Sequence, residues 1–259
     1  MKISYRINYF NFSKIKFDGS QNFDTIYFDS IQTCNLHCLY CHNKRINQKI
    51  TEGQLLQFIN LYVESTENFQ IGCAMEPTMD KNMGKIALAV SKSRAKPAKS
   101  FRLQTNGTLL HRHDIDELKE AKINNISISF DTINETIHKE LRGGSDLNKI
   151  IENIKNLRKK WPELFISLVT TVNKLNINDI ENVSKFAIEN GINSINLRKM
   201  FYFSNSRIIE NHDKMKDILI PNSVFVENVL KLKSMYKNKL IINFMDEEKH
   251  ENFENKINR

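Results

Sequence analysis

Three cysteines near the start of the sequence have the residue type and spacing to hold an inorganic centre. Cys34, Cys38 and Cys41 form the pattern CxxxCxxC. Thiolates are ligands of zinc and of iron–sulfur clusters; four protein ligands close such a site, whereas three leave one position open for chemistry. The spacing therefore predicts a metal centre whose open position is available to a reacting molecule.

Other interpretations of the same loop remain open at this point. A zinc site could recruit His37, His42 or Cys73 as a fourth ligand, and the thiols could also be unligated with chance spacing. A ferredoxin-like electron carrier needs a fourth cysteine nearby, and none follows within the loop. The crowding of the cysteines favours a reducing compartment over a disulfide framework; they stand at 34, 38, 41 and 73.

The motif resembles the signature of the radical S-adenosylmethionine (SAM) enzymes, because an aromatic residue, Tyr40, directly precedes the last cysteine. In that family three cysteines hold a [4Fe–4S] cluster, and the unique iron is chelated by the amino and carboxylate groups of SAM. Reductive cleavage of SAM gives methionine and a 5′-deoxyadenosyl radical that abstracts a substrate hydrogen. The resemblance implies that Cys34, Cys38 and Cys41 are the iron ligands and that Tyr40 lies beside the adenine.

The elements that must position this loop alternate between strand and helix. Runs of β-branched and aromatic residues predict six strands, at 25–31, 69–75, 100–104, 125–130, 164–172 and 194–199. Apolar residues at helical spacing predict helices from 51 onward and at 85–94, 114–122, 135–141, 146–160 and 178–190. This alternation predicts an α/β fold with a parallel sheet. Periodicity alone does not separate a partial barrel from an open doubly wound sheet; the resemblance implies a partial (βα)6 TIM-like barrel.

The same rhythm predicts how the chain is divided. Residues 1–203 are expected to form the radical SAM partial-barrel domain, with its core at 25–200. A strand or two and a turn at 18–20 are expected before the core. Residues 204–259 are expected to form a short C-terminal extension that covers the barrel mouth. The elements expected in this extension are a helix near 223–233, a strand at 240–244 and a charged tail.

The loop after the second expected strand carries the next candidate. Gly72-Cys-Ala-Met-Glu-Pro-Thr78 resembles the family's Gly-Gly-Glu-Pro segment, which receives the amino group of SAM, although the second glycine is not in place. The match implies that Glu76 contacts the SAM amino group, and a generic turn is the alternative. Cys73, in the same loop, is expected to be a buried small hydrophobe, with a substrate or cluster contact as the alternative.

The turn after the third expected strand also resembles the family. Thr105-Asn-Gly-Thr108 matches a Thr-Asn-Gly turn that is common there, which makes Asn106 a candidate cofactor contact. A plain strand-to-helix turn is the alternative, because Asn-Gly is expected in such turns anyway. The position after the third strand strengthens the resemblance.

A longer match follows the fourth expected strand. Ser-x-Asp, at Ser129 and Asp131, is followed by His and then by Leu-Arg-Gly, as in the molybdopterin-precursor cyclase and peptide-modifying branches of the family. The resemblance implies that Ser129 and Asp131 lie near the SAM ribose and methionine or near the substrate. Asp131 could instead cap a helix, and Arg142 could be a structural clamp rather than a carboxylate binder.

The ends of the fifth and sixth strands contribute candidates by position. Thr170, Thr171 and Asn173 close the fifth strand, where the family commonly places polar contacts to the SAM ribose. Leu197 closes the sixth strand, where backbone and apolar groups commonly flank the adenine. The resemblance therefore implies Thr171 and Leu197 as cofactor contacts.

Charge and hydropathy limit the partners. The net charge is 38 − 30 = +8, which could favour an anionic substrate, a nucleic acid or an acidic peptide. The lysines are spread over many expected helices, so a solvated basic surface is the simpler explanation and nucleic acid is not expected as a partner. No apolar run approaches the roughly 18–20 residues that span a bilayer, and the N-terminus lacks a signal-peptide core, so we expect a cytoplasmic protein without membrane contact.

Together these matches predict a radical SAM enzyme that abstracts hydrogen from a peptide or small-metabolite substrate. No cysteine follows Cys73, which predicts a single cluster without an auxiliary one, and the reaction would need an external donor of the flavodoxin or ferredoxin type. Glycyl-radical-activating enzymes are similar in size and also carry CxxxCxxC. Their usual Asp-Gly-Pro-Gly stretch before the cysteines is missing here, so that class is not expected. The alternative is a non-catalytic zinc or iron–sulfur binding module with a basic nucleic-acid-binding surface.

Overall fold

The computed structural model describes residues 4–7, 23–64, 66–202 and 212–244. The turn expected at 18–20, the stretch directly after 203 and the charged tail lie outside these residues. The chain divides into two compact units, which we call the first and the second unit. The first comprises 1–36, 43–128 and 148–166, and the second comprises 37–42, 129–147 and 167–259.

The first unit is built on parallel strands. Its strands are β1 (Ser4–Ile7), β2 (Phe23–Phe28), β4 (Thr66–Ile71), β5 (Ser100–Thr105) and β6 (Asn125–Ser129). They pair in the order β1-β2-β4-β5-β6, and Ile71 lies opposite both Phe28 and Leu103. These three side chains are almost fully buried, which fixes the register because a slip of one residue would expose them.

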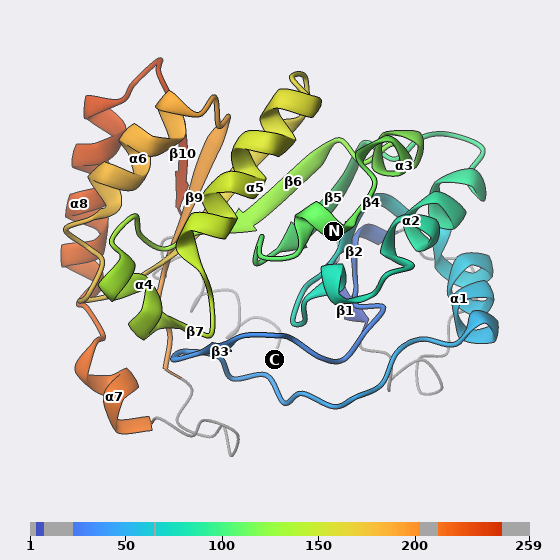
Figure 1. Ribbon diagram of the computed structural model, residues 1–259, viewed down its shortest axis with the longest axis horizontal. Coiled ribbons are helices and arrows are strands. Elements are labelled where there is room, and N and C mark those ends of the chain that lie inside the picture. The colour runs from blue at the N-terminus through green and yellow to red at the C-terminus, as the bar shows by residue number, and fades with distance from the viewer. Residues whose placement is uncertain (1–3, 8–22, 65, 203–211, 245–259) are drawn as a thin grey trace, which may run out of the picture. The chain divides into compact units, whose positions relative to one another are not determined.

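The helices of this unit lie between or after these strands in the sequence. They are α1 (Glu52–Phe58), α2 (Met83–Lys92), α3 (Ile115–Glu120) and α5 (Leu147–Lys160). Figure 1 shows α1, α2 and α3 along one side of β2, β4 and β5. Thr51 caps α1 with a reciprocal bond to Gln54, and the helix continues as a π-helical turn over Ile59–Val63. Phe58 stacks on Phe28 with 4.4 Å between ring centres, so the helix is held to the sheet.

The second unit repeats this design. Its strands are β8 (Phe165–Val172), β9 (Ser194–Lys199) and β10 (Ile241–Phe244), all parallel, with β9 between the other two. Its helices are α4 (Glu135–Leu141), α6 (Ile180–Glu189), α7 (His212–Asp217) and α8 (Asn222–Met235). Figure 1 shows α6 and α8 beside β9 and β10. The described part of the expected extension thus adds α8 and β10 to this unit, while its role over a barrel mouth stays a prediction.

A separate antiparallel pair joins two short strands of the second unit. These are β3 (His37–Cys38), inside the cysteine motif, and β7 (Arg142–Gly143), which directly follows α4. The sequence did not predict this pair, nor did it predict α7 or the π-helical turn. A two-residue strand has no periodicity of its own, and its partner lies about a hundred residues away.

The predicted elements are otherwise present, with shifted ends. The strand expected over 69–75 ends at Ile71 because Gly72 has φ +82°. A Cβ at Gly72 would lie 2.2 Å from the carbonyl oxygen of Gln104, so only glycine permits this turn. Cys73 therefore follows the strand, and the expectation that it is buried is wrong: its side chain is exposed.

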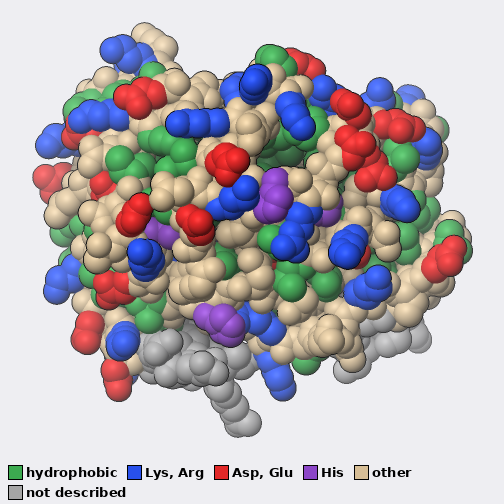
Figure 2. All heavy atoms as spheres, viewed as in Figure 1, with side chains coloured by type: hydrophobic (Ala, Val, Ile, Leu, Met, Phe, Trp, Pro, Cys, Tyr) green, Lys and Arg blue, Asp and Glu red, His purple; other side chains and the backbone are tan. Residues whose placement is uncertain are grey.

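The surface is charged but mixed. On the face drawn in Figure 2, Lys and Arg side chains lie among Asp and Glu side chains and form no continuous basic patch. Within the described ranges, every helix is too short or too polar to cross a bilayer.

Candidate functional site

The polar candidates of the first unit lie at the carboxyl ends of its parallel strands. Asp29 directly follows β2, the loop 72–78 follows β4, and the turn 105–108 follows β5. Carboxyl ends of parallel strands meet at one edge of a sheet, which is where α/β proteins bind ligands. The observed strand order therefore brings Asp29, the loop 72–78 and the turn 105–108 to the same edge of the sheet.

Glu76 is the centre of this group. Its carboxylate is buried, with 2% of the residue exposed. Oε1 accepts hydrogen bonds from the backbone N–H of Thr78 (3.1 Å), from the Thr78 hydroxyl and from the Thr105 hydroxyl (2.6 Å). Oε2 accepts the backbone N–H of Asn106 at 2.6 Å. Burial raises the pKa of Glu76 and these hydrogen bonds oppose the rise; among the described residues, the carboxylate forms no ion pair.

A second carboxylate shapes the loop that carries Glu76. Asp29 is 3% exposed, and it accepts hydrogen bonds from three successive backbone N–H groups, those of Cys73 (2.8 Å), Ala74 and Met75. The Asn43 side chain donates to the carbonyl oxygen of Ala74 at 3.2 Å. The sequence did not single out Asp29, although a polar residue that directly follows a buried parallel strand is a usable signal.

Asn106 contacts the first cysteine of the motif. Its Nδ2 lies 3.8 Å from Cys34 Sγ and donates to Asn35 Oδ1 at 2.9 Å. The backbone N–H of Leu36 also points at Cys34 Sγ, at 3.5 Å. Two N–H donors at one sulfur stabilise the thiolate, which is the form that ligates iron, so Cys34 suits a cluster ligand. Asn106 was predicted as a cofactor contact, and this geometry places it beside Cys34, a predicted cluster ligand.

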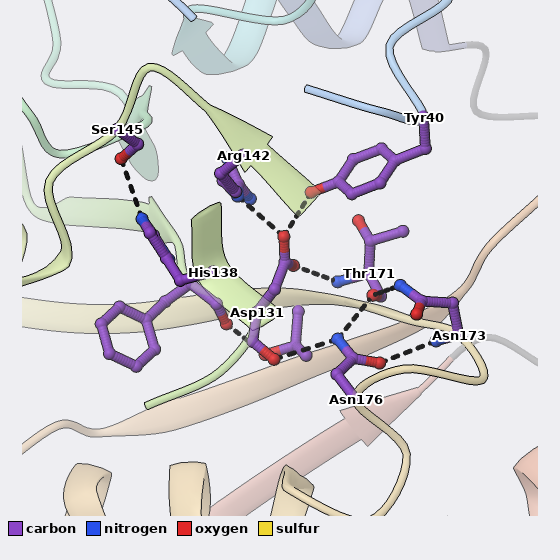
Figure 3. Close-up of polar contacts among 10 residues, drawn as sticks. Tyr40, Asp131, His138, Arg142, Ser145, Thr171, Asn173 and Asn176 are labelled. Atoms are coloured by element: carbon purple, nitrogen blue, oxygen red, sulfur yellow. Dashed lines mark hydrogen bonds and ion pairs between the residues drawn. The ribbon is translucent and has the colours of Figure 1, made fainter. Parts of the chain in front are cut away.

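The second unit has its own buried carboxylate, Asp131, which is 0% exposed. Its Oδ2 accepts hydrogen bonds from the Tyr40 hydroxyl and from Arg142 Nε (2.7 Å), and its Oδ1 accepts the backbone N–H of Thr171 at 2.8 Å (Figure 3). Asp131 does not cap a helix: the N-cap of α4 is Asn134. Arg142 was considered either as a structural residue or as a binder of a ligand carboxylate. The structure shows the structural role, because its guanidinium donates to the buried carboxylate of Asp131.

In this network Arg142 stays positively charged and Tyr40 stays neutral. Burial lowers the pKa of Arg142, but the negative charge of Asp131 more than offsets it, and the pKa lies well above its ordinary value. Burial raises the pKa of Tyr40 well above its ordinary value although Arg142 opposes the rise, so the phenol stays protonated and donates. The Arg142 guanidinium also lies 5.9 Å from the centre of the Tyr40 ring.

His138 lies on α4, within reach of the charge of Arg142. It is fully buried, and its Nε2 lies 2.9 Å from the Ser145 hydroxyl (Figure 3). Burial, together with the positive charge of Arg142, lowers the pKa of His138 to about 4. The imidazole is therefore neutral near pH 7 and adds no charge to the network.

Asn176 joins the backbone around Asp131. Its Nδ2 donates to the carbonyl oxygens of Asp131 and Thr171, both at 3.0 Å, and its Oδ1 accepts the backbone N–H of Asn173 at 2.8 Å (Figure 3). The Asn173 side chain donates to the Thr171 carbonyl oxygen at 3.2 Å. Thr171, predicted as a cofactor contact, and Asn173, named with it at the end of the fifth strand, are part of this hydrogen-bonded segment. Asn176 was missed; the Asn-x-x-Asn spacing was its only signal.

The remaining candidates have less distinctive surroundings. Ser129 is the half-buried last residue of β6, and Leu197 is buried within β9 with 1% exposed. Their proximity to SAM stays a prediction, as do the SAM contacts of Tyr40, Glu76, Asn106, Asp131 and Thr171.

The three motif cysteines are half-buried and form no disulfide. Cys34 belongs to the first unit, whereas Cys38 and Cys41 belong to the second, where the Cys41 N–H donates to the Cys38 carbonyl oxygen at 3.0 Å. Among the described residues no group of three His, Cys, Asp or Glu side chains is arranged as a metal site. The cluster ligands therefore stay a prediction that rests on the donor chemistry.

Known proteins resemble this chain in sequence. A probable GTP 3′,8-cyclase of Methanocaldococcus jannaschii is 25% identical over 207 residues, which cover 75% of this chain and 67% of the relative. A GTP 3′,8-cyclase of Clostridium acetobutylicum is 26% identical over 173 residues, covering 64% of this chain and 54% of the relative. The chain thus spans about half to two thirds of these relatives.

Solved structures share the fold. Streptococcus suis SuiB, crystallised with the precursor peptide SuiA, matches with a TM-score of 0.67 at 17% identity, over 87% of this chain and 49% of that chain. This match confirms the predicted α/β class of the partial TIM barrel. The family model of the radical SAM superfamily matches residues 29–187, more than half of the chain. The protein therefore belongs to the radical SAM superfamily and is an enzyme that uses a [4Fe–4S] cluster and SAM.

Proposed function

We propose that this enzyme abstracts a hydrogen atom from a peptide or small-metabolite substrate, with Cys34, Cys38 and Cys41 holding its only cluster and Glu76 contacting the amino group of SAM. The observation that carries this proposal is the carboxylate of Glu76, buried at the carboxyl ends of parallel strands and bonded by neutral donors. When bound, the cluster and SAM supply the radical chemistry. The chain's own residues hold and orient them.

The chemistry of Glu76 supports the amino contact. A buried carboxylate without a positive partner is unfavourable, which is why the pKa of Glu76 is raised. An ammonium group within hydrogen-bond distance would supply the missing charge. Oε2 accepts the Asn106 N–H, and a carboxylate oxygen has lone pairs for a second donor.

The single cluster is proposed on the cysteine count. Beyond the motif the sequence contains only Cys73, and the side chain of Cys73 is exposed on a loop of the first unit. Auxiliary clusters need several thiolates of their own. The electron for SAM cleavage is proposed to come from a flavodoxin- or ferredoxin-type donor.

The substrate class follows from two kinds of relatives. GTP 3′,8-cyclases are named for a nucleotide, and SuiB was solved with a precursor peptide. We therefore propose a peptide or a small metabolite, and GTP is the first small molecule to test.

The experiment is an anaerobic SAM-cleavage assay. The protein is reconstituted with iron and sulfide, reduced with dithionite and mixed with SAM, and 5′-deoxyadenosine is quantified with and without GTP. We expect about four irons per chain and nucleoside formation. A variant with Cys34, Cys38 and Cys41 all changed to Ala serves as the control. It should bind no cluster iron and form no 5′-deoxyadenosine.

Two results would overturn parts of the proposal. Stoichiometric zinc without SAM cleavage would make the cysteine loop a structural metal site. About eight irons per chain would contradict the single cluster while leaving the radical chemistry intact.

A further inference from the structure

The half of the motif that carries Cys38 and Cys41 is bonded to the second unit through its backbone. Cys38 pairs with Arg142 and His37 pairs with Gly143 in the β3–β7 ladder. The N–H of Leu39 donates to the carbonyl oxygen of Leu141 at 2.9 Å. Cys38 and Leu39 are therefore bonded to the residues at the end of α4, and Cys41 is bonded to Cys38 through its N–H at 3.0 Å.

Close approach of the two backbones depends on Gly143. A Cβ at this position would lie 2.9 Å from the carbonyl oxygen of His37, closer than real Cβ contacts allow. The Leu-Arg-Gly stretch thus has a packing reason for its glycine, in addition to the resemblance that first drew attention to it.

Side-chain contacts hold residues 38–41 in addition to these backbone bonds. The Tyr40 hydroxyl donates to Asp131, and Leu39 and Tyr40 both pack against a buried apolar cluster of Leu141, Met200 and Ile218. Arg142 contributes twice, because its backbone pairs with Cys38 while its guanidinium donates to Asp131. Asp131 is thus bonded to the loop directly and also through the residue that pairs with it.

We propose that Asp131 is a positioning residue of the cysteine motif, which through Tyr40 and Arg142 holds residues 38–41 in one conformation before any cluster is bound. The consequence for the cluster rests on the proposed roles of Cys38 and Cys41 as its ligands. A segment that is already ordered loses less conformational entropy when it binds, so two of the three thiolates are presented at lower cost.

Two variants separate this role from contact with SAM. Tyr40→Phe removes only the hydroxyl that reaches Asp131 and keeps the ring that the family places beside the adenine. Asp131→Asn keeps the shape but leaves Arg142 without a negative partner. Asp179→Asn is the matched control: Asp179 accepts bonds from the Thr132 hydroxyl and the Ile133 N–H in the same unit but touches no residue of the motif.

The test is amide hydrogen exchange on the full-length chain, measured with the cluster present and after its removal by a chelator. In the wild type we expect the amides of Leu39 and Cys41 to stay protected in both states. After cluster removal, Tyr40→Phe and Asp131→Asn should exchange at these amides roughly tenfold faster or more. Asp179→Asn should behave like the wild type there.

Several outcomes would overturn the proposal. Wild-type protection that disappears with the cluster would mean that the cluster, not Asp131, orders the segment. Unchanged exchange in Tyr40→Phe would show that its hydroxyl contributes nothing. Exchange of Tyr40→Phe that rises equally in all strands would indicate general destabilisation and not a local role of its hydroxyl. Because the cluster-free readout requires no SAM cleavage, a failure of the proposed reaction would leave this test interpretable.

A second readout measures the consequence for the cluster. We expect iron release to a chelator to be several-fold faster in Tyr40→Phe than in Asp179→Asn. The midpoint of global unfolding should differ little between these two variants. Equal rates of iron release would contradict the proposed role in ligand positioning.

Discussion

Glu76 in the first unit and Asp131 in the second are both buried carboxylates near the carboxyl ends of parallel strands, and the two are stabilised differently. Glu76, in the first unit, is bonded by two hydroxyls and two backbone amides. Asp131, in the second, is bonded by a guanidinium, a phenol and one backbone amide. Both are almost inaccessible to solvent. Among the described residues, the Glu76 carboxylate has no positively charged partner, whereas the Asp131 carboxylate is paired with the Arg142 guanidinium.

This difference indicates what each carboxylate can do. A buried charge that lacks a counter-ion gains most from a cationic ligand, which suits Glu76 to an ammonium group. A carboxylate already paired with Arg142 has little left to gain from a cation but much to lose if the pair breaks. We therefore expect Glu76 substitutions to act mainly on SAM binding and Asp131 substitutions to act mainly on structure.

The largest effect is expected for Asp131→Asn. It leaves the buried Arg142 without a counter-charge, and breaking such a pair costs roughly 3–5 kcal/mol of unfolding free energy. Urea unfolding of the cluster-free chain measures it. Adding Arg142→Met should recover much of the loss, because no unpaired charge then remains. A loss below about 1 kcal/mol would mean that this pair behaves like an exposed one.

The next largest effect is expected for Glu76→Gln on SAM affinity. The change removes the negative charge and places an amide N–H₂ against the N–H of Asn106 or against the hydroxyl of Thr105. Loss of a charge-assisted hydrogen bond of about 1.5–3 kcal/mol corresponds to roughly tenfold weaker binding or more. Equilibrium dialysis of SAM on the cluster-loaded protein measures it. The comparison fails if Asp131→Asn weakens SAM binding as much while residues 38–41 keep their amide protection.

A pH dependence should follow from the raised pKa of Glu76. The raised pKa of Glu76 means that the native state binds this proton more tightly than the unfolded chain, whose carboxyl titrates near 4.5. The stability that the group contributes is therefore fully present below the unfolded pKa and is lost as the pH rises through the native pKa. As the pH rises above 4.5, the unfolding free energy of Glu76→Gln should increase relative to that of the wild type.

Urea unfolding of both proteins between roughly pH 4 and pH 7 measures this trend. Gln does not titrate, so the difference between the two proteins isolates the carboxyl group. A difference that does not change with pH would mean that Glu76 titrates as it does in the unfolded chain. SAM affinity of the wild type should rise over the same interval, because the ionised form binds the ammonium.

The smallest effect is expected for Asn106→Ala. It removes one N–H donor from Cys34 Sγ and one bond to Asn35, which should cost about 0.5–1.5 kcal/mol of stability. Hydrogen bonds to cluster sulfurs favour the reduced form, so the reduction potential of the cluster should become more negative. A redox titration followed by electron paramagnetic resonance measures the shift. A more positive potential would contradict the proposed bond to the ligand.

Much of this arrangement was predictable from the sequence. The strand–helix alternation predicted the sheet, and the family resemblance singled out Glu76, Asn106, Asp131 and Thr171, whose cofactor contacts stay predictions. This worked because each signal is local or repeats with a fixed period. The parallel sheet then collects the ends of the strands at one edge.

The contacts within the site were not predictable. Nothing in the sequence pairs Tyr40 with Asp131, because the two are 91 residues apart and meet only through the fold. Cys73 was assigned to a buried strand because Phe69–Met75 is nearly all apolar, but the positive φ of Gly72 ends the strand first. Asp29 was missed because it fell inside the strand expected over 25–31, which ends at Phe28 in the structure, and Asn176 was missed because its Asn-x-x-Asn spacing is a weak signal.

The β3–β7 pair also bears on protein engineering. A designer who transplants a CxxxCxxC loop into another α/β scaffold would supply three sulfur donors but not their arrangement. In this protein the arrangement of the last two depends on a distant tripeptide, Leu141-Arg-Gly143, and on Asp131. The smallest transferable module is therefore discontinuous in sequence, and a graft limited to the motif omits the residues that give it shape.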